Sequence, residues 1–173
     1  MHEECTRAAR PGATTAEVDA AARAVLERRG ARSNFLGYHG FPAVICASPI
    51  EVVVHGIPGD RVLAEGDILS IDCGAIIEGW HADAAVTVPI GAIDAESQRL
   101  LEVTEASLWA AIEQVVEGRR LGDIGAAVEG LAEAAGFTVV REYVGHGIGT
   151  AMHEEPQVRS EEHTSELQSR LHL

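Results

Sequence analysis

Two aspartates are the first residues in this sequence that could do chemistry together. Asp72 and Asp83 lie in neighbouring stretches rich in β-branched residues, which are typical of strands. A tight antiparallel turn at Ile77 and Glu78 would place the two aspartates directly opposite each other, with both carboxylates on one face. Carboxylates this close repel unless a proton or a cation neutralises them, and a divalent metal is the usual solution. The alternative is a pair of surface carboxylates on a solvated face.

Three histidines stand in short motifs that suit a ligand-binding role. His146 lies in GHGIG, His153 follows seven residues later in MHEEP, and His55 lies in HGIP directly after an apolar run. Glycine lets the backbone approach a ligand closely, and imidazole is a common metal ligand and proton carrier. A single histidine is more often a packed or surface residue. Three of them beside a carboxylate pair favour a metal-dependent site.

The elements that must position these residues follow from capping signals and periodicity. Thr14 and Glu17 have the pattern of a capping box, which predicts a helix over 15–29 that ends at Gly30. The aromatic and glycine-rich segment 35–42 is expected to be an ordered loop that carries function. Apolar patterns predict strands over 43–47, 52–55, 67–77, 81–90 and 137–143, and helices over 94–118 and 122–135. This order predicts an α+β domain with helices outside a mostly antiparallel sheet.

Length and composition restrict the function classes. The chain has 173 residues, of which 46% are hydrophobic, and a formal net charge of −14. These values suit one compact domain and argue against nucleic-acid or anionic-membrane partners. Three cysteines without CxxC spacing predict neither a disulfide framework nor a zinc knuckle, so a reducing cytoplasm fits best. The sequence has no signal-peptide pattern and no apolar run of membrane-spanning length.

Four segments together resemble type I methionine aminopeptidase. They are FLGYHGFP, VVVHGIPGD, GDILSIDCGAIIEGWHADAAVT and VVREYVGHGIGTAMHEEPQV, and the resemblance extends from Gly12 to Val158. It implies the α+β pita-bread (creatinase/aminopeptidase) fold, in which a curved antiparallel sheet has helices on its outside. It also implies a metal-dependent hydrolase that removes the initiator methionine from nascent proteins.

The resemblance implies a role for each candidate residue. Asp72 resembles the first metal-ligating aspartate of the family, Asp83 the aspartate that bridges two metals, and His146 the histidine ligand of the second metal. His153 resembles the histidine that hydrogen-bonds the substrate amide or the tetrahedral intermediate. His55 resembles the histidine that lines the substrate site and assists the scissile region.

The same resemblance implies a substrate pocket, cofactors and partners. Tyr38, His39 and Phe41 match the loop that forms the methionine pocket, and Cys46 falls near it. The implied cofactors are two divalent metal ions (Co, Mn, Fe or Zn), which agree with carboxylate and imidazole ligands. The implied partner is the N-terminal methionine of nascent polypeptides, close to the ribosome. The complete enzyme is expected to be a cytoplasmic monomer without nucleic-acid or membrane partners.

The sequence departs from the family pattern at its end. The family metal site includes two glutamates downstream of the HEEP segment, and no matching segments are present here. Ten residues, 159–168, equal the in-frame translation of a sequencing-library adapter. We therefore expect a partial catalytic domain over 1–158, with the C-terminal part of the fold missing, followed by disordered read-through over 159–173. Such a chain is expected to be inactive, weakly metal-binding and poorly soluble.

Two other interpretations stay open. Aminopeptidase P and prolidase share the fold and the metal aspartates, although the HGIP and HEEPQV segments favour the methionine enzyme. A pita-bread protein that has lost ligands could instead serve as a binding module. Cleavage of Met-Ala peptides against Xaa-Pro peptides separates the two enzymes. Metal-dependent activity separates an enzyme from a binding module.

Overall fold

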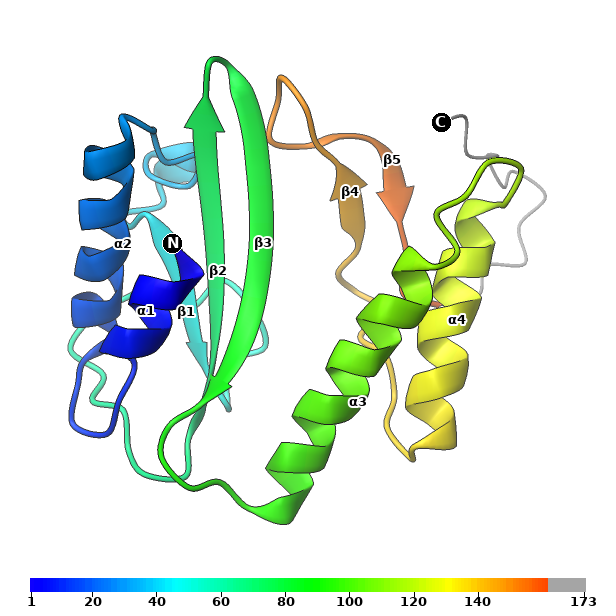
Figure 1. The fold of residues 1–173 in the computed structure, drawn as a ribbon, viewed down its shortest axis with the longest axis horizontal. Coiled ribbons are helices and arrows are strands. Elements are labelled where there is room, and N and C mark those ends of the chain that lie inside the picture. Colours follow the sequence, from blue (N-terminus) through cyan, green and yellow to red (C-terminus); the bar gives the residue numbers. More distant parts are fainter. Residues whose placement is uncertain (162–173) are drawn as a thin grey trace. The chain divides into compact units, whose positions relative to one another are not determined.

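The computed structural model describes residues 1–161 in two compact units (Figure 1). The sheet unit contains Met1–Ser97 and Ile148–Met152. The helical unit contains Gln98–Gly147 and, among the described residues, 153–161. From residue 162 onward, the predicted read-through lies outside the described residues.

Two helices open the sheet unit. α1 spans His2–Ala8 and α2 spans Thr15–Arg29. The predicted capping box is confirmed: Oγ1 of Thr14 accepts from the backbone N–H of Glu17 at 3.2 Å, and the Glu17 carboxylate accepts from the backbone N–H of Thr14 at 2.6 Å. Gly30 ends α2 with a φ of 62°, a left-handed conformation that glycine adopts without strain. The predicted helix over 15–29 is therefore confirmed.

A buried carboxylate joins α2 to the sheet. Asp19 accepts hydrogen bonds from the backbone N–H groups of Val44 at 2.8 Å and Ile45 at 3.2 Å, and from Nε of Arg23 at 2.6 Å. The residue is 6% exposed. Because a buried carboxylate needs such donors, these bonds fix where the chain enters β1, which spans Ile45–Pro49.

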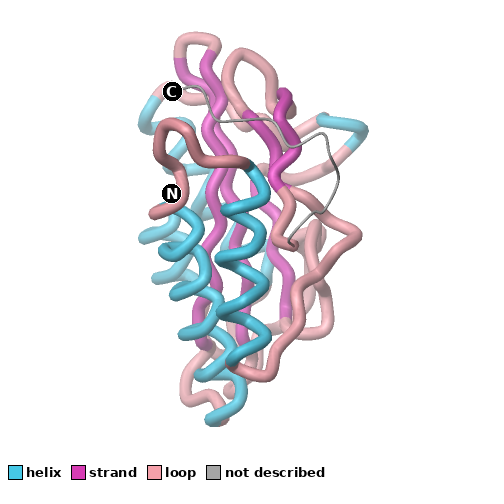
Figure 2. Tube along the Cα trace, turned by 90° about the vertical axis from the view of Figure 1, so that its right-hand side faces the viewer, coloured by secondary structure: helices cyan, strands magenta, loops and turns pink. Residues whose placement is uncertain are grey.

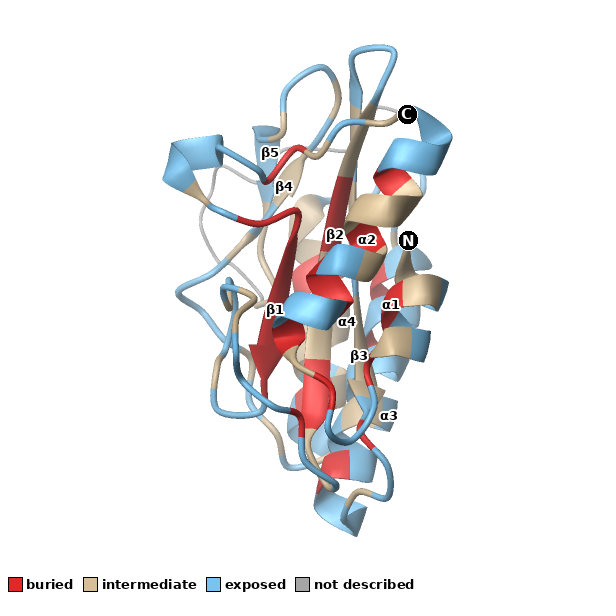
Figure 3. Ribbon diagram, turned by 90° about the vertical axis from the view of Figure 1, so that its left-hand side faces the viewer, coloured by how far each residue is buried: buried red, intermediate tan, exposed pale blue. Residues whose placement is uncertain are grey.

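Three strands form an antiparallel sheet with two chemically different faces. β2 spans Ile68–Ile77 and β3 spans Trp80–Pro89, and they form the long hairpin drawn in magenta in Figure 2, with the sheet order β1-β2-β3. One face packs against α1 and α2 and forms the core, and Figure 3 shows β1 buried along its whole length. The core residues on this face are Ile45, Ala47, Leu69, Ile71 and Cys73. The opposite face carries the polar side chains Ser48, Ser70, Asp72, Asp83 and Thr87.

The turn of the β2–β3 hairpin lies one residue later than predicted. Ile77 pairs with Trp80, so Glu78 and Gly79 form the two-residue loop, with φ values of 53° and 87°. A two-residue hairpin loop of this kind needs a positive φ at both central positions. Glycine adopts that conformation readily, whereas β-branched Ile77 resists it. The prediction that Ile77 belongs to the loop is wrong for this reason.

The helical unit contains two helices and a small sheet. α3 spans Ala95–Ile112, with its first residues in the sheet unit, and α4 spans Leu121–Ala134. β4, Gly145–Gly147, pairs antiparallel with β5, Glu154–Val158. Both predicted helices are present, but α3 ends before Gly118 because residues 114–116 form tighter turns. No helix among the described residues is long and apolar enough to cross a membrane.

Two segments predicted as strands are loops. At 52–55 the chain turns back toward Pro49, and His55 has a φ of 59°. At 137–143 the described part of the chain offers no strand that pairs with the segment. A β-branched composition favours a strand only where another strand completes the hydrogen-bond ladder. The antiparallel sheet with helices packed on it nevertheless confirms the predicted α+β class.

Candidate active site

Asp72 on β2 and Asp83 on β3 lie on the same face of the hairpin, diagonally across the ladder. Asp72 pairs with Ala85, and Asp83 pairs with Gly74. The predicted direct opposition of the two aspartates is therefore wrong, because the later turn shifts each ladder partner by two positions. A shift by two keeps every side chain on its face, and diagonal neighbours remain within reach of each other. The two carboxylates are thus neighbours despite the wrong register.

The electrostatics of this pair favour a cation. The pKa of Asp72 is raised to about 7, first by burial, then by the charge of Asp83 and by the hydrogen bond between the two carboxyl groups. Oδ1 of Asp83 is buried and has no hydrogen-bond partner among residues 1–161. A carboxylate oxygen without a donor, beside a second carboxylate, suits a hard divalent ion, which would replace the shared proton. The residues present therefore fit a metal site.

Cys46 lies on the same polar face, opposite Asp72 in the β1–β2 ladder. It is 5% exposed, and burial together with the charges of Asp72 and Asp83 raises the pKa of its thiol to about 12. The thiol therefore stays protonated at neutral pH, and a protonated thiol is neither a nucleophile nor a metal ligand. Its contribution at this position is a small, weakly polar surface beside the carboxylates.

The structure brings His146 and His153 together in the helical unit. Their ring centroids lie 4.1 Å apart. His146 lies in β4, where an irregularity interrupts the pairing with β5 directly after it. Nδ1 of His146 lies 2.9 Å from the carbonyl oxygen of Gly147, and because a carbonyl only accepts, this contact favours the tautomer with the proton on Nδ1. The lone pair is then on Nε2, which suits a metal-ligand role.

His55 lies in the loop that follows β1, next to a glycine that is packed against that strand. The N–H of Gly56 donates to Oγ of Ser48 at 3.0 Å, and its carbonyl accepts from the N–H of Ala47 at 2.9 Å. A Cβ at Gly56 would lie 2.2 Å from the carbonyl oxygen of Ala47, so only glycine permits this approach. These bonds hold the HGIP segment against β1 and leave His55 exposed beside it.

Tyr38, His39 and Phe41 lie in the predicted loop, which contains a short 3₁₀ turn over Tyr38–Gly40. The Phe41 ring packs edge-on against the ring of Phe35, with centroids 6.4 Å apart, and Phe35 is buried. The rings of Tyr38 and His39 also contact edge-on, with centroids 4.4 Å apart. The loop therefore has exposed aromatic side chains and is anchored by the buried ring of Phe35.

The predicted site residues form two pairs. Asp72 neighbours Asp83 in the sheet unit, and His146 contacts His153 in the helical unit. No cluster of three or more His, Cys, Asp or Glu side chains that could hold a metal ion is found among the described residues.

Sequence reasoning missed two polar residues beside the aspartates. Oδ1 of Asn34 and Nδ1 of His81 are both buried and lack a hydrogen-bond partner within the described chain. The available signal for Asn34 was Gly74, because an isolated glycine inside a strand often marks the close approach of another group. Nothing in the sequence around His81 indicated that its Nδ1 is buried.

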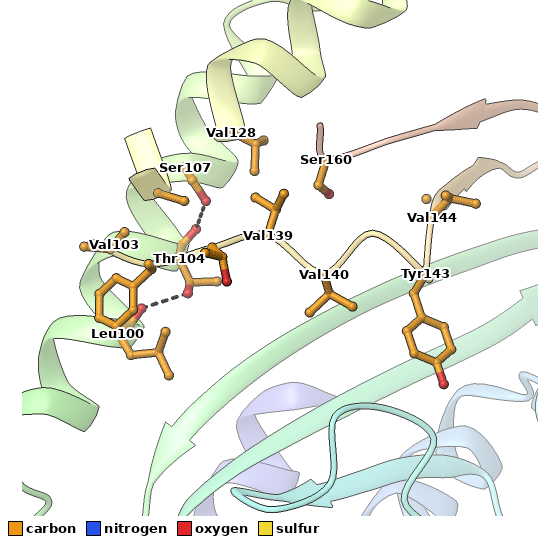
Figure 4. A pocket seen from close by; sticks show the side chains of 14 residues that line it. Leu100, Val103, Thr104, Ser107, Val128, Val139, Val140, Tyr143, Val144 and Ser160 are labelled. Atoms are coloured by element: carbon orange, nitrogen blue, oxygen red, sulfur yellow. Dashed lines mark hydrogen bonds between the residues drawn. The ribbon is translucent and has the colours of Figure 1, made fainter. Parts of the chain in front are cut away.

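The helical unit also contains an apolar cavity of about 370 Å³. Figure 4 shows its walls, which come from α3, α4 and the segment 137–145. The hydroxyl groups of Thr104 and Ser107 in the wall donate to carbonyls within α3, at 2.7 and 2.8 Å, so they add little polarity to the cavity. None of the predicted site residues lines it. The cavity is therefore separate from the candidate chemistry.

Comparison with known proteins identifies relatives over most of the chain. A family model described as metallopeptidase family M24 matches residues 1–171. Methionine aminopeptidase 1 of Bacillus subtilis is 47% identical over 157 residues, which are 91% of this chain and 63% of the relative. Methionine aminopeptidase of Clostridium acetobutylicum is 50% identical over 153 residues, which are 88% and 61% of the two chains. The chain thus spans about three fifths of the length of these curated relatives.

Solved structures show the same fold. The crystal structure of a methionine aminopeptidase from Thermotoga maritima matches with a TM-score of 0.93 at 36% identity, over 97% of this chain and 68% of that one. The prolidase from Pyrococcus horikoshii OT3 matches with a TM-score of 0.81 at 18% identity, over 99% of this chain and 47% of that one. The second likeness concerns the fold alone. Together they confirm the predicted pita-bread architecture.

Proposed function

This chain belongs to metallopeptidase family M24, and on that premise we propose that the protein is a metal-dependent aminopeptidase that removes the initiator methionine from nascent polypeptides. Curated relatives named methionine aminopeptidase, at 47% and 50% identity, support this activity. The substrate is then a polypeptide with a free N-terminal methionine. We assign the activity to the cytoplasm, where nascent chains begin and where the free cysteines Cys5, Cys46 and Cys73 would stay reduced.

The half-buried Asp72–Asp83 pair is the observation that carries this proposal, because a cation would partner the buried Oδ1 of Asp83 and lower the raised pKa of Asp72. In the proposed site, Asp72 would hold one metal ion, Asp83 would be a ligand of both ions, and His146 would be a ligand of the second. Carboxylate and imidazole ligands suit Mn, Fe, Co or Zn. When bound, two such ions supply Lewis acidity toward the scissile carbonyl and lower the pKa of a water molecule.

The remaining residues act on the substrate in this proposal. His153 hydrogen-bonds the substrate amide or the tetrahedral intermediate, and its ring contacts that of His146. His55 lines the substrate site beside β1. Tyr38, His39 and Phe41 form the methionine pocket, since aromatic side chains make favourable contacts with a thioether.

A peptide-hydrolysis assay on the protein expressed from its source gene tests this function. With added Mn²⁺ or Co²⁺ we expect release of methionine from Met-Ala-Ser, which chelation and the variants Asp72→Asn and Asp83→Asn abolish. Asp60→Asn, at an exposed aspartate of the same unit, is the matched control and should keep full activity. Preferential cleavage of Xaa-Pro peptides would instead support a prolidase-type enzyme. Metal binding without any hydrolysis would support a binding module.

A further inference from the structure

Three polar side-chain atoms are buried without a hydrogen-bond partner among the described residues, and all three belong to one patch of the sheet unit. They are Oδ1 of Asn34, Nδ1 of His81 and Oδ1 of Asp83. His81 and Asp83 share a face of β3, and Asp83 pairs with Gly74 on β2. Buried polar atoms without partners are uncommon in native proteins. Three such atoms near the Gly74–Asp83 pair of the ladder indicate a functional site.

Asn34 occupies the space of the side chain that Gly74 lacks. A Cβ built on Gly74 would lie 1.8 Å from Oδ1 of Asn34, so the amide lies on the face that carries Asp72 and Asp83. Nδ2 of Asn34 donates to the carbonyl of Ala82 at 3.3 Å, directly before Asp83 on β3. Asn34 is 5% exposed. The amide is therefore a buried neighbour of the carboxylate pair and is attached to the strand that holds Asp83.

The backbone is held on both sides of Asn34. Before it, Arg32 and Ile76 of β2 exchange two backbone hydrogen bonds of 3.1 and 2.7 Å. After it, the chain enters the loop 35–42, and Oγ of Ser33 accepts from the first N–H of that loop at 3.0 Å. Asn34 thus makes a side-chain hydrogen bond between the start of the loop and the hairpin, at the level of the aspartates.

We propose that Asn34 is a positioning residue that joins the loop 35–42, which carries the methionine pocket, to the Asp72–Asp83 pair. Its amide holds the loop against β3 and restricts the space open to the Asp83 carboxylate. An amide suits this place because it donates to the Ala82 carbonyl without adding a third negative charge. The consequence for metal and substrate binding rests on the proposed function, whereas the attachment of the loop does not.

The variant Asn34→Ala in the protein expressed from its source gene tests this role with two measurements. Amide hydrogen exchange over residues 35–42, measured without metal, should become about tenfold faster because the loop loses its attachment to β3. Titration calorimetry with Mn²⁺ should show an affinity lower by about tenfold, the effect typical of groups that orient a metal ligand. Leu36→Ala is the matched control, because Leu36 lies in the same loop but is 50% exposed, and it should change neither quantity.

Wild-type exchange together with wild-type Mn²⁺ affinity in Asn34→Ala would overturn the proposal. The double variant Asn34→Ala/Gly74→Ala places a methyl group in the space that the Asn34 amide leaves. If this variant regains the wild-type Mn²⁺ affinity, Asn34 only fills space and the proposal is overturned. A Mn²⁺ affinity that stays low in the double variant supports the positioning role.

Asn34→Ser keeps a short polar side chain and should give an intermediate loss of Mn²⁺ affinity if the alanine variant does not fold. If the wild-type protein from the source gene binds no Mn²⁺, the proposed function is contradicted, and the exchange rates then still decide whether Asn34 holds the loop.

Discussion

The aspartate hairpin and the histidine segment are held in place by different kinds of structure. Asp72 and Asp83 lie on long strands whose opposite face packs into the buried core beneath α1 and α2. His146 and His153 lie at a short two-stranded sheet, β4 and β5, whose residues are exposed or half-buried. Buried apolar area stabilises the first pair, whereas local backbone fit must hold the second. One half of the proposed ligand set is therefore organised by the core and the other by close backbone contacts.

Among the variants that compare the two regions, Asp83→Asn is expected to have the largest effect, which is on Mn²⁺ affinity. Asparagine keeps the shape of the side chain but removes a charge, so the Mn²⁺ affinity should fall by more than roughly 100-fold, since even groups that only orient a metal ligand cost about 10–100-fold. Burial raises the pKa of Asp72 and the charge of Asp83 raises it further, so without metal the same change should stabilise the chain by removing this second contribution. Calorimetric titration and urea unfolding with a chelator measure the two effects.

A lower Mn²⁺ affinity together with a higher stability without metal distinguishes a metal ligand from a structural carboxylate. Asp60→Asn, at an exposed position of the same unit, should change neither the affinity nor the stability. Equal Mn²⁺ affinity in Asp83→Asn and the wild type would remove the hairpin from the proposed metal site.

Asp19→Ala should cost the most stability, about 3 kcal/mol, because two backbone N–H groups and the Arg23 guanidinium lose a buried acceptor. Urea unfolding of the metal-free chain measures this loss. Glu27→Ala, at an exposed position of the same helix, is the control and should stay within about 0.5 kcal/mol of the wild type. A loss below 1 kcal/mol would show that the entry into β1 does not depend on Asp19.

Gly147→Ala tests the backbone fit of the histidine segment. The new Cβ would lie 2.4 Å from the carbonyl oxygen of Glu155, which cannot move away as a side chain could, so we expect a cost of about 2 kcal/mol and faster amide exchange in β4 and β5. Gly145→Ala is the matched comparison, because its Cβ would lie 3.1 Å from the Val158 carbonyl oxygen and should be tolerated better. Equal exchange in the two variants would mean that close fit at Gly147 does not hold this sheet.

The pH dependence of the metal-free chain should follow Asp72. Its folded pKa of about 7 lies above the ordinary value of 3.8, so the folded state binds more protons between these limits and the free energy of unfolding decreases as the pH rises from about 4 to 7. Because Asp72 is only half-buried, we expect a smaller effect than that of Asp19→Ala. Urea unfolding across this range, with a chelator present, measures the slope. A slope that Asp72→Asn leaves unchanged would assign the dependence to other groups.

Local signals allowed part of this structure to be predicted from the sequence. The helix over 15–29 was predicted correctly because its capping box and its terminal glycine act within a few residues. The segments 52–55 and 137–143 were wrongly predicted as strands, because a strand also needs a partner that its own residues do not specify. The α+β class was nevertheless predicted correctly, since it depends on the long amphipathic segments.

The candidate site shows the same division between local and long-range information. Asp72 and Asp83 were expected to be neighbours and are, because the two-position error in register preserved the face of each strand. Asn34 was missed, because its place beside Gly74 arises from chain segments that are distant in sequence. Chemically distinctive residues can thus be found from the sequence, whereas the uncharged residue that joins two segments requires the fold.

The smallest effects are expected at the hairpin turn, where two substitutions should act in opposite directions. Glu78 has a φ of 53°, which asparagine adopts more readily, so Glu78→Asn should stabilise the chain by about 0.5 kcal/mol. Gly79 has a φ of 87°, so Gly79→Ala should destabilise it by about 1 kcal/mol. Urea unfolding measures both changes. If the core face sets the register of the hairpin, neither variant should alter the Mn²⁺ affinity of the aspartates. A change in affinity at either position would instead show that the turn sets the register, and that the aspartate pair depends on local backbone fit as the histidine pair does.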